Sequence, residues 1–189
     1  MVQTPTRLIT LADFLQQPET KPASEYIDSQ IIQKPMPQGE HSTLQRGLTR
    51  EIDNALSPLK IAHAYPELRC TFGGRSIVPD VLIFRWERIP RQPNGRVANR
   101  FDLHPDWTIE ILSPDQSQTK VTRSILHCLE HGTEMGWMID SEESGVFAYQ
   151  PNQAPRFFDR PQMVLPVPNF AGEVELTVKQ LFDWLTDLR

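Results

Sequence analysis

The sequence contains few of the residues and segments that would set it apart from ordinary globular proteins. Cys70 and Cys128 are the only cysteines among its 189 residues. Two cysteines without Cys-x-x-Cys spacing are too few for a disulfide framework, so we expect both to be reduced. No apolar run reaches the length of a membrane span, and the first residues lack the apolar core of a signal peptide. We therefore expect a cytoplasmic protein without a membrane segment.

Positive charge is also scarce. The chain carries 19 lysines and arginines against 24 acids, a net charge of -5, which argues against a general binder of polyanions. The exception is the segment 85–100, in which arginines outnumber acids by five to one. We therefore expect any nucleic-acid contact to be local, with Arg85, Arg88 and Arg91 as the candidate residues.

Length and composition fit one globular domain covering residues 1–189. The chain is 39% hydrophobic and 23% charged, and it is long enough to bury a substantial core. The element order predicts an α/β (α+β) fold with one mixed central sheet flanked by helices. In the first third of the chain, the sequence patterns predict a helix capped by Thr10, a hairpin that turns at Asp28–Ser29, and a helix from Ser42 or Thr43 to about Ser57. They then predict a strand near either 61–65 or 68–72, followed by strands at 76–84 and at 107–113. The last predicted elements are a helix from Ser113 to about His131, a hairpin formed by 136–140 and 146–150, and a helix from Thr177 to Leu188.

Two short apolar runs each carry one carboxylate, Asp80 in 76–84 and Glu110 in 107–113. Successive side chains of a strand point to opposite faces of a sheet, and in both runs apolar residues occupy the positions of both faces. This pattern predicts strands that are covered on both faces. A buried carboxylate is unfavourable unless a cation or a hydrogen-bond donor meets it. Two carboxylates on neighbouring strands would also repel each other, and a divalent metal between them is one remedy. The simpler alternatives are that Asp80 marks a turn at a strand start and that Glu110 faces water.

Phosphodiester hydrolysis needs a metal that lowers the pKa of water and a cation near the developing phosphate charge. The helix after the Glu110 strand is expected to supply the cation, because its start lies at the end of that strand. Helical phase places Lys120 beside the buried face and Arg123 nearly opposite, pointing to water, so Lys120 is the candidate. The alternative is that Lys120 is an ordinary surface lysine. The expected buried face consists of Val121, Ile125, Cys128 and Leu129.

Other polar groups are weaker candidates. Glu25, in the first hairpin, could add a third carboxylate. His41 immediately precedes a helix, so it is expected either to cap that helix or to contact a phosphate. His127 and His131 lie four residues apart, a spacing that can hold a metal, but no third ligand lies near them in the sequence.

The sequence resembles the Uma-type family of restriction-endonuclease-like nucleases over nearly its whole length. The chain has a Pro-Asp motif and a Glu-x-Leu-Ser-Pro motif, followed by a helix and a Gly-x-x-x-x-Trp motif. Together these motifs are specific for the family, although neither of the first two is so alone. The resemblance implies the PD-(D/E)xK fold, with Asp80 and Glu110 as ligands of Mg²⁺ or Mn²⁺. The matching motifs are the helix around Leu11 and Phe14, Glu25-Tyr-Ile-Asp-Ser, His41, Val78-Pro-Asp-Val, Glu110-Ile-Leu-Ser-Pro, Gly132 through Trp137-Met-Ile-Asp, and the terminal residues 176–185.

Two features depart from the family pattern. In the wider superfamily a lysine stands two residues after the second acid, where this chain has Leu112. In this branch the lysine comes from the following helix, near Ser124, and Lys120 one turn earlier is the available substitute. Ser29 replaces the glycine usual in the first hairpin. The absence of a lysine at Leu112 and Ser124 weakens the expectation of catalytic activity more than the expectation of the fold.

Three functional hypotheses follow from the sequence. The first is a metal-dependent endonuclease acting on DNA, with Asp80, Glu110, Lys120 and Glu25 in the catalytic site, and a two-fold dimer would suit cleavage of both strands of a duplex. The second is a catalytically inactive nuclease fold that binds DNA or protein, which Ser124 and the acidic charge favour. The third is a structural or oligomer-forming protein in which the two central carboxylates are polar core residues.

Overall fold

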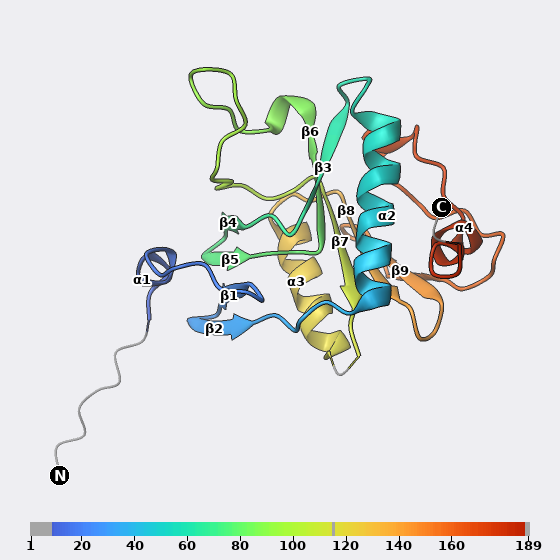
Figure 1. Ribbon diagram of the computed structural model, residues 1–189, viewed down its shortest axis with the longest axis horizontal. Coiled ribbons are helices and arrows are strands. Elements are labelled where there is room, and N and C mark those ends of the chain that lie inside the picture. The colour runs from blue at the N-terminus through green and yellow to red at the C-terminus, as the bar shows by residue number, and fades with distance from the viewer. Residues whose placement is uncertain (1–8, 115, 188–189) are drawn as a thin grey trace, which may run out of the picture.

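The computed structural model describes residues 9–114 and 116–187, and its largest element is a six-stranded sheet (Figure 1). The strand order is β10-β9-β8-β7-β6-β3. Within it β7 and β8 run parallel and all other neighbours antiparallel, so the sheet is mixed, as predicted. The strands are β3 Ala62–Pro66, β6 Val81–Arg85, β7 Trp107–Leu112, β8 Met135–Asp140, β9 Gly145–Tyr149 and β10 Arg156–Phe158.

A second, antiparallel sheet of four short strands, in the order β2-β1-β5-β4, was not predicted from the sequence. The β1–β2 hairpin turns through Asp28 and Ser29, whose φ angles are 49° and 64°. This left-handed conformation favours glycine, yet here two non-glycine residues adopt it. The strands are β1 Ser24–Ile27, β2 Gln30–Gln33, β4 Cys70–Phe72 and β5 Arg75–Ile77.

The predicted strand 76–84 is in fact two strands that belong to different sheets. β5 ends at Ile77, β6 begins at Val81, and Asp80 lies in the crossing between them. Pro79 interrupts the run, because proline has no N–H to donate to a strand ladder. Asp80 therefore lies at the point where the chain passes from the small sheet into the large one.

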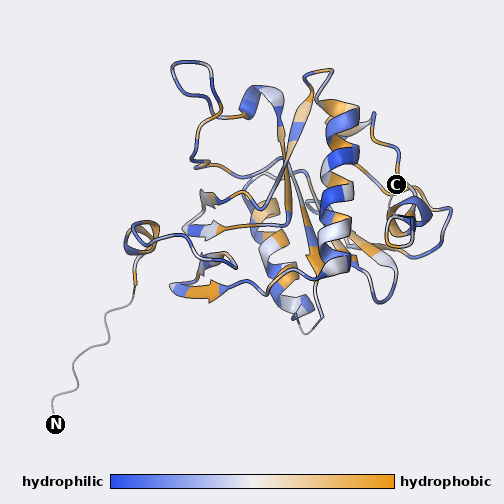
Figure 2. Ribbon diagram, in the orientation of Figure 1, coloured by the Kyte–Doolittle hydropathy of each residue, from blue (hydrophilic) through white to orange (hydrophobic). Residues whose placement is uncertain are grey.

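Helices cover both faces of the large sheet (Figure 1). The apolar stripe of α2 (Gly39–Leu56) packs on one face, against a core that includes Ile83, Ile109 and Trp137. The buried face of α3 (Gln118–Glu130) packs on the other, against Met138 and Tyr149. Figure 2 shows hydrophobic colour along β6 and β7, between these helices, and mixed colour on α2.

The remaining helices are short. α1 (Leu11–Leu15) is capped by Thr10, as predicted. α4 (Val178–Asp183) follows the cap residue Thr177 but ends earlier than predicted, and Leu188 lies outside the described residues. No helix in the described part of the chain is long and apolar enough to cross a membrane. The two 3-10 turns are η1 Trp86–Arg88 and η2 Asn169–Ala171.

Candidate functional site

The register of β6 and β7 brings the two predicted carboxylates together. Val81 pairs with Ile109, so Asp80, one residue before β6, lies beside Glu110. Only 3% of the Asp80 side chain and 8% of the Glu110 side chain are exposed. The N–H of Ile111 donates to Asp80 Oδ2 at 2.8 Å. Asp80 does mark a strand start, whereas Glu110 does not face water.

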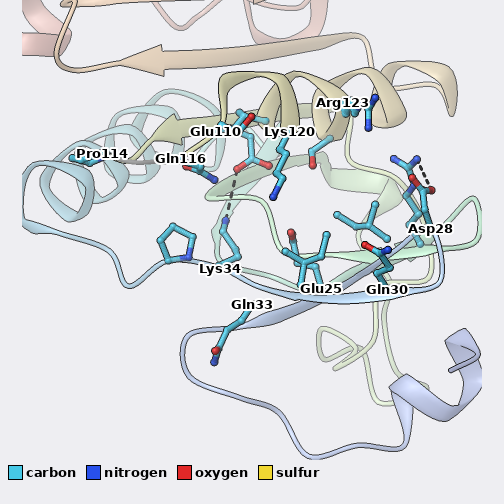
Figure 3. A pocket seen from close by; sticks show the side chains of 17 residues that line it. Glu25, Asp28, Gln30, Gln33, Lys34, Glu110, Pro114, Gln116, Lys120 and Arg123 are labelled. Carbon is cyan, nitrogen blue, oxygen red and sulfur yellow. Dashed lines mark hydrogen bonds and ion pairs between the residues drawn. The ribbon is translucent and has the colours of Figure 1, made fainter. Parts of the chain in front are cut away.

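Lys34, which the sequence did not single out, lies against this pair. Its Nζ is 2.6 Å from Asp80 Oδ1. The same atom is 3.7 Å from Glu110 Oε2, a pair marked by a dashed line in Figure 3. It also donates to the carbonyl of Val78 at 2.7 Å. Burial opposes the charge of Lys34, but Asp80, Glu110 and Glu25 outweigh burial and raise the pKa of the lysine above its usual range. The site therefore contains a permanent cation.

The two carboxylates differ in protonation. Burial disfavours the charged form of Asp80, yet the nearby Lys34 and His41 hold its pKa well below the usual range. Glu110 is farther from the lysine, so burial, together with the charge of Asp80, raises the pKa of Glu110 well above its usual range. The lysine and the histidine thus favour the charged form of Asp80, whereas burial favours the neutral form of Glu110.

His41 contacts Asp80 from α2. The helix begins at Gly39, so His41 lies in its first turn and is not the predicted cap. Its Nε2 is 3.4 Å from Asp80 Oδ1, and its Nδ1 is 3.1 Å from the hydroxyl of Ser113. One turn later, Gln45 donates to the carbonyl of Asp80 at 2.9 Å. α2 therefore fixes both the side chain and the backbone of Asp80, while contact of His41 with a phosphate stays a prediction.

Glu25 brings a third buried carboxylate from β1. Its Oε1 accepts a hydrogen bond from the N–H of Val78 at 2.7 Å, and burial raises its pKa. Glu25 lines the same cavity as Glu110 and Lys34 (Figure 3). The structure thus places Glu25 near the central pair, and a catalytic role for it remains a prediction.

Two recesses meet at these groups. The larger, of about 540 Å³, is lined by Glu110 and lies between the β1–β2 hairpin and α3 (Figure 3). The smaller, of about 430 Å³, is lined by Asp80 and His41. Lys34, Pro35 and Gln116 line both recesses. The two carboxylates therefore lie at the boundary between the recesses and face different ones.

Lys120, the predicted catalytic lysine, lines the larger recess from the first turn of α3, and Figure 3 shows its side chain directed towards the cavity. Arg123 is exposed, as predicted, and it also lines the same recess. The recess extends along more than one turn of α3, so both flanks of this helix reach it. A direct catalytic role for Lys120 stays a prediction, because Lys34 is the lysine that contacts Asp80.

Comparison with known proteins gives the family. A family model described as "Uma2: Putative restriction endonuclease" matches residues 11–179. The chain belongs to the Uma2 family. It is similar to a crystal structure of a "putative nuclease belonging to DUF820" from Anabaena variabilis ATCC 29413, with 59% sequence identity and a TM-score of 0.92 over 94% of this chain and 99% of the other. No curated protein matches the chain. The family resemblance and the restriction-endonuclease-like fold expected from the sequence are confirmed.

In this Uma2 chain, the arginines predicted to contact nucleic acid lie at the other end of β6 from Asp80 (Figure 1). Arg85 is the last residue of the strand, roughly 17 Å along it from Asp80. Arg85 and Arg88 both pair with buried Asp106, and Arg91 donates to a carbonyl of its own loop. Internal partners thus occupy these side chains, and their contact with nucleic acid stays a prediction.

The pair His127 and His131 belongs to an aromatic cluster around Phe72. The ring of His127 stacks on Phe72 with centroids 4.9 Å apart, and the Nδ1 of His131 is 2.8 Å from the carbonyl oxygen of His127. Burial, with the nearby charge of Arg75, lowers the pKa of His127 to about 4. A neutral stacked imidazole explains the spacing without a metal.

We expect His127 to make the stability of this Uma2 fold depend on acid pH. Its folded pKa of about 4 lies below its ordinary value of 6.5, so its contribution is complete above pH 6.5 and is lost as the pH falls towards 4. The loss is about 1–3 kcal/mol of unfolding free energy. Urea unfolding at pH 7 and pH 4.5 should show a smaller difference in His127→Phe than in the wild type. An equal difference in the two proteins would contradict this role.

The donor set of the Uma2 site suits a hard divalent cation. Asp80 and Glu110 present carboxylate oxygens, the ligands that Mg²⁺ prefers, and the ammonium of Lys34 lies against both, as a cation would. Within residues 9–114 and 116–187, no three His, Cys, Asp or Glu side chains are grouped to hold a metal. An ion here would take two protein carboxylates and water, which is a common arrangement for Mg²⁺. The residues fit such an ion if the Lys34 ammonium moves aside.

Proposed function

We propose that this protein is a metal-dependent endonuclease that hydrolyses phosphodiester bonds in DNA. The observation that carries the proposal is the cluster of Asp80, Glu110 and Lys34 where two recesses meet, in a chain of a nuclease-like family. Asp80 and Glu110 would hold Mg²⁺ or Mn²⁺. The bound ion would lower the pKa of the attacking water and offset charge on the phosphate.

The protein's own groups divide the remaining work. Lys34 keeps its proton, so once its ammonium has moved aside for the ion it would supply positive charge for the developing phosphate charge and would not act as a base. His41 and the N–H of Ile111 hold Asp80 in one orientation. We assign to Lys34 the charge-stabilising role that the sequence suggested for Lys120, because Lys34 is within contact distance of Asp80.

The direct test is cleavage of labelled DNA, as plasmid and as oligonucleotide, with Mg²⁺, with Mn²⁺ and with EDTA. The proposal expects internal cleavage that needs the metal. A homodimer would place one such site on each strand of a DNA duplex. Nicks that occur in pairs, one in each strand of plasmid DNA, would support that arrangement. Absence of cleavage of every DNA with either metal would overturn the proposal.

The second candidate is a nuclease fold that binds DNA without turnover. The position of the Lys34 ammonium, where a cation would contact both carboxylates, favours it. This candidate expects DNA binding that EDTA leaves unchanged, with no product after long incubation. Turnover that begins when Mn²⁺ is added would exclude it.

A further inference from the structure

The two recesses restrict how a substrate can lie across the site. Glu110 lines the larger recess and Asp80 the smaller one, while Lys34, Pro35 and Gln116 line both and form the boundary. A phosphodiester that approaches both carboxylates must therefore lie at this boundary. The nucleosides on its two sides then occupy different recesses.

Each recess has room for a nucleotide-sized group. Volumes of about 540 and 430 Å³ lie in the range of small-ligand pockets, which is roughly 300–1,000 Å³. The carboxylates are almost fully buried, so a phosphate must enter the recess to approach them. The β1–β2 hairpin and α3 bound the larger recess on two sides (Figure 3). A paired strand would have to bring its complement into the space that these elements fill.

The charges around the site also fit one short strand. Arg75, Lys120 and Arg123 line the larger recess in addition to Lys34, and Arg75 is already paired with Asp28 at 2.8 Å. Duplex binders commonly neutralise about 6–10 phosphates. Lys21 and Arg69 line the smaller recess, and of the six cations in the two recesses Lys34, Arg69 and Arg75 are paired with acids. With a net charge of -5 and the arginines of 85–100 at the far end of β6, the surroundings of the site offer fewer contacts.

We infer that the DNA strand which enters the site is unpaired, as a single strand, a frayed end or a flap, and that Lys120 and Arg123 bind its phosphates next to the scissile bond. The inference rests on the proposed function and restricts the DNA substrate to unpaired strands. Among the described lining residues of the two recesses, His41 is the one aromatic side chain. Base stacking is therefore limited, and binding depends on the backbone with little sequence preference.

The test is fluorescence anisotropy of the full chain in EDTA, with a labelled 12-nucleotide single strand and the same sequence as a hairpin duplex. The single strand is expected to bind at least about tenfold more tightly, with a slope of log affinity against log salt of about -2, as about three phosphate contacts give. Equal or tighter binding of the duplex, or a slope of about -5 or steeper, would overturn the inference.

A pair of double variants locates the contacts. Lys120→Gln with Arg123→Gln is expected to weaken single-strand binding about tenfold and to reduce the slope by one to two. Arg96→Gln with Arg100→Gln, which removes the same charge from the exposed loop after β6, should leave binding unchanged. Loss of binding in the loop variant but not in the recess variant would contradict the assignment.

Cleavage rates separate this inference from the proposed function. Metal-dependent cleavage of a duplex as fast as that of a single strand would refute the unpaired substrate and leave the nuclease intact. Cleavage of neither would refute the nuclease, and the EDTA binding preference would still decide which strand the recess accepts.

Discussion

Replacing Lys34 by methionine is expected to reduce the rate of metal-dependent DNA cleavage by about 10²–10³-fold. A positioned donor or cation at developing charge contributes on this scale when water is excluded, and Lys34, of whose side chain 13% is exposed, is in contact with Asp80. Single-turnover cleavage at saturating metal measures the effect. Lys179→Met is the matched control, because Lys179 forms an exposed pair with Asp183 far along the chain in α4.

The same substitution tests the electrostatics without reference to activity. In Lys34→Met, the Asp80 and Glu110 carboxylates lose their counter-charge, so the unfolding free energy at neutral pH should fall by about 3–5 kcal/mol. Loss of the lysine raises the folded pKa of both acids. Because both proteins share the same unfolded state, the destabilisation is absent only below the lowered folded pKa of Asp80 in the wild type, and it develops as the pH rises from there through the raised folded pKa values of the variant. Mn²⁺ should restore part of the loss. Stability and cleavage equal to those of Lys179→Met would contradict both roles of Lys34.

Asp80→Asn is expected to reduce cleavage by about 10³-fold or more. A metal contributes several kcal/mol to the transition state, each tenfold in rate corresponds to about 1.4 kcal/mol, and a neutral amide is a poor ligand for the ion. The amide oxygen can still accept from the N–H of Ile111, so the strand junction is preserved better than with alanine. Rates with saturating substrate, together with a melting curve, separate lost chemistry from lost folding.

Asp53→Asn is the control for Asp80→Asn. Asp53 lies in the second half of α2, where it is 2.9 Å from His63 and accepts the N–H of Ala64, away from both recesses. Its replacement should lower the melting temperature and leave cleavage near the wild-type rate. Wild-type cleavage by Asp80→Asn would refute the site, whatever Asp53→Asn does.

The carboxylates could be predicted from the sequence, whereas the lysine could not. Asp80 and Glu110 each interrupt a short apolar run, which is a local pattern, and the antiparallel register then places them side by side. Lys34 lies 46 residues before Asp80, in a polar segment after a four-residue strand. Its position depends on a small sheet whose strands are too short to give a clear periodicity.

The arginines of the segment 85–100 show a second kind of feature that the sequence alone does not reveal, namely which charges are paired in the folded protein. A count of charges along 85–100 detects the excess of arginine, but it cannot include acids that arrive from elsewhere in the chain. Asp106 and Glu134 pair with Arg85, and Asp106 also pairs with Arg88. Helical phase likewise predicted that Arg123 is exposed but not that it lines the larger recess, because phase gives the direction of a side chain and not the extent of the recess beside it.

The most direct test of the account is a calorimetric titration with Mn²⁺ of the wild type, of Asp80→Asn and of Glu110→Gln. We expect the wild type to bind about one ion per chain at millimolar concentrations or below, and each variant to bind at least about tenfold more weakly. A wild type that binds no Mn²⁺ at several millimolar, or variants that bind it as well as the wild type, would contradict a metal site at Asp80 and Glu110.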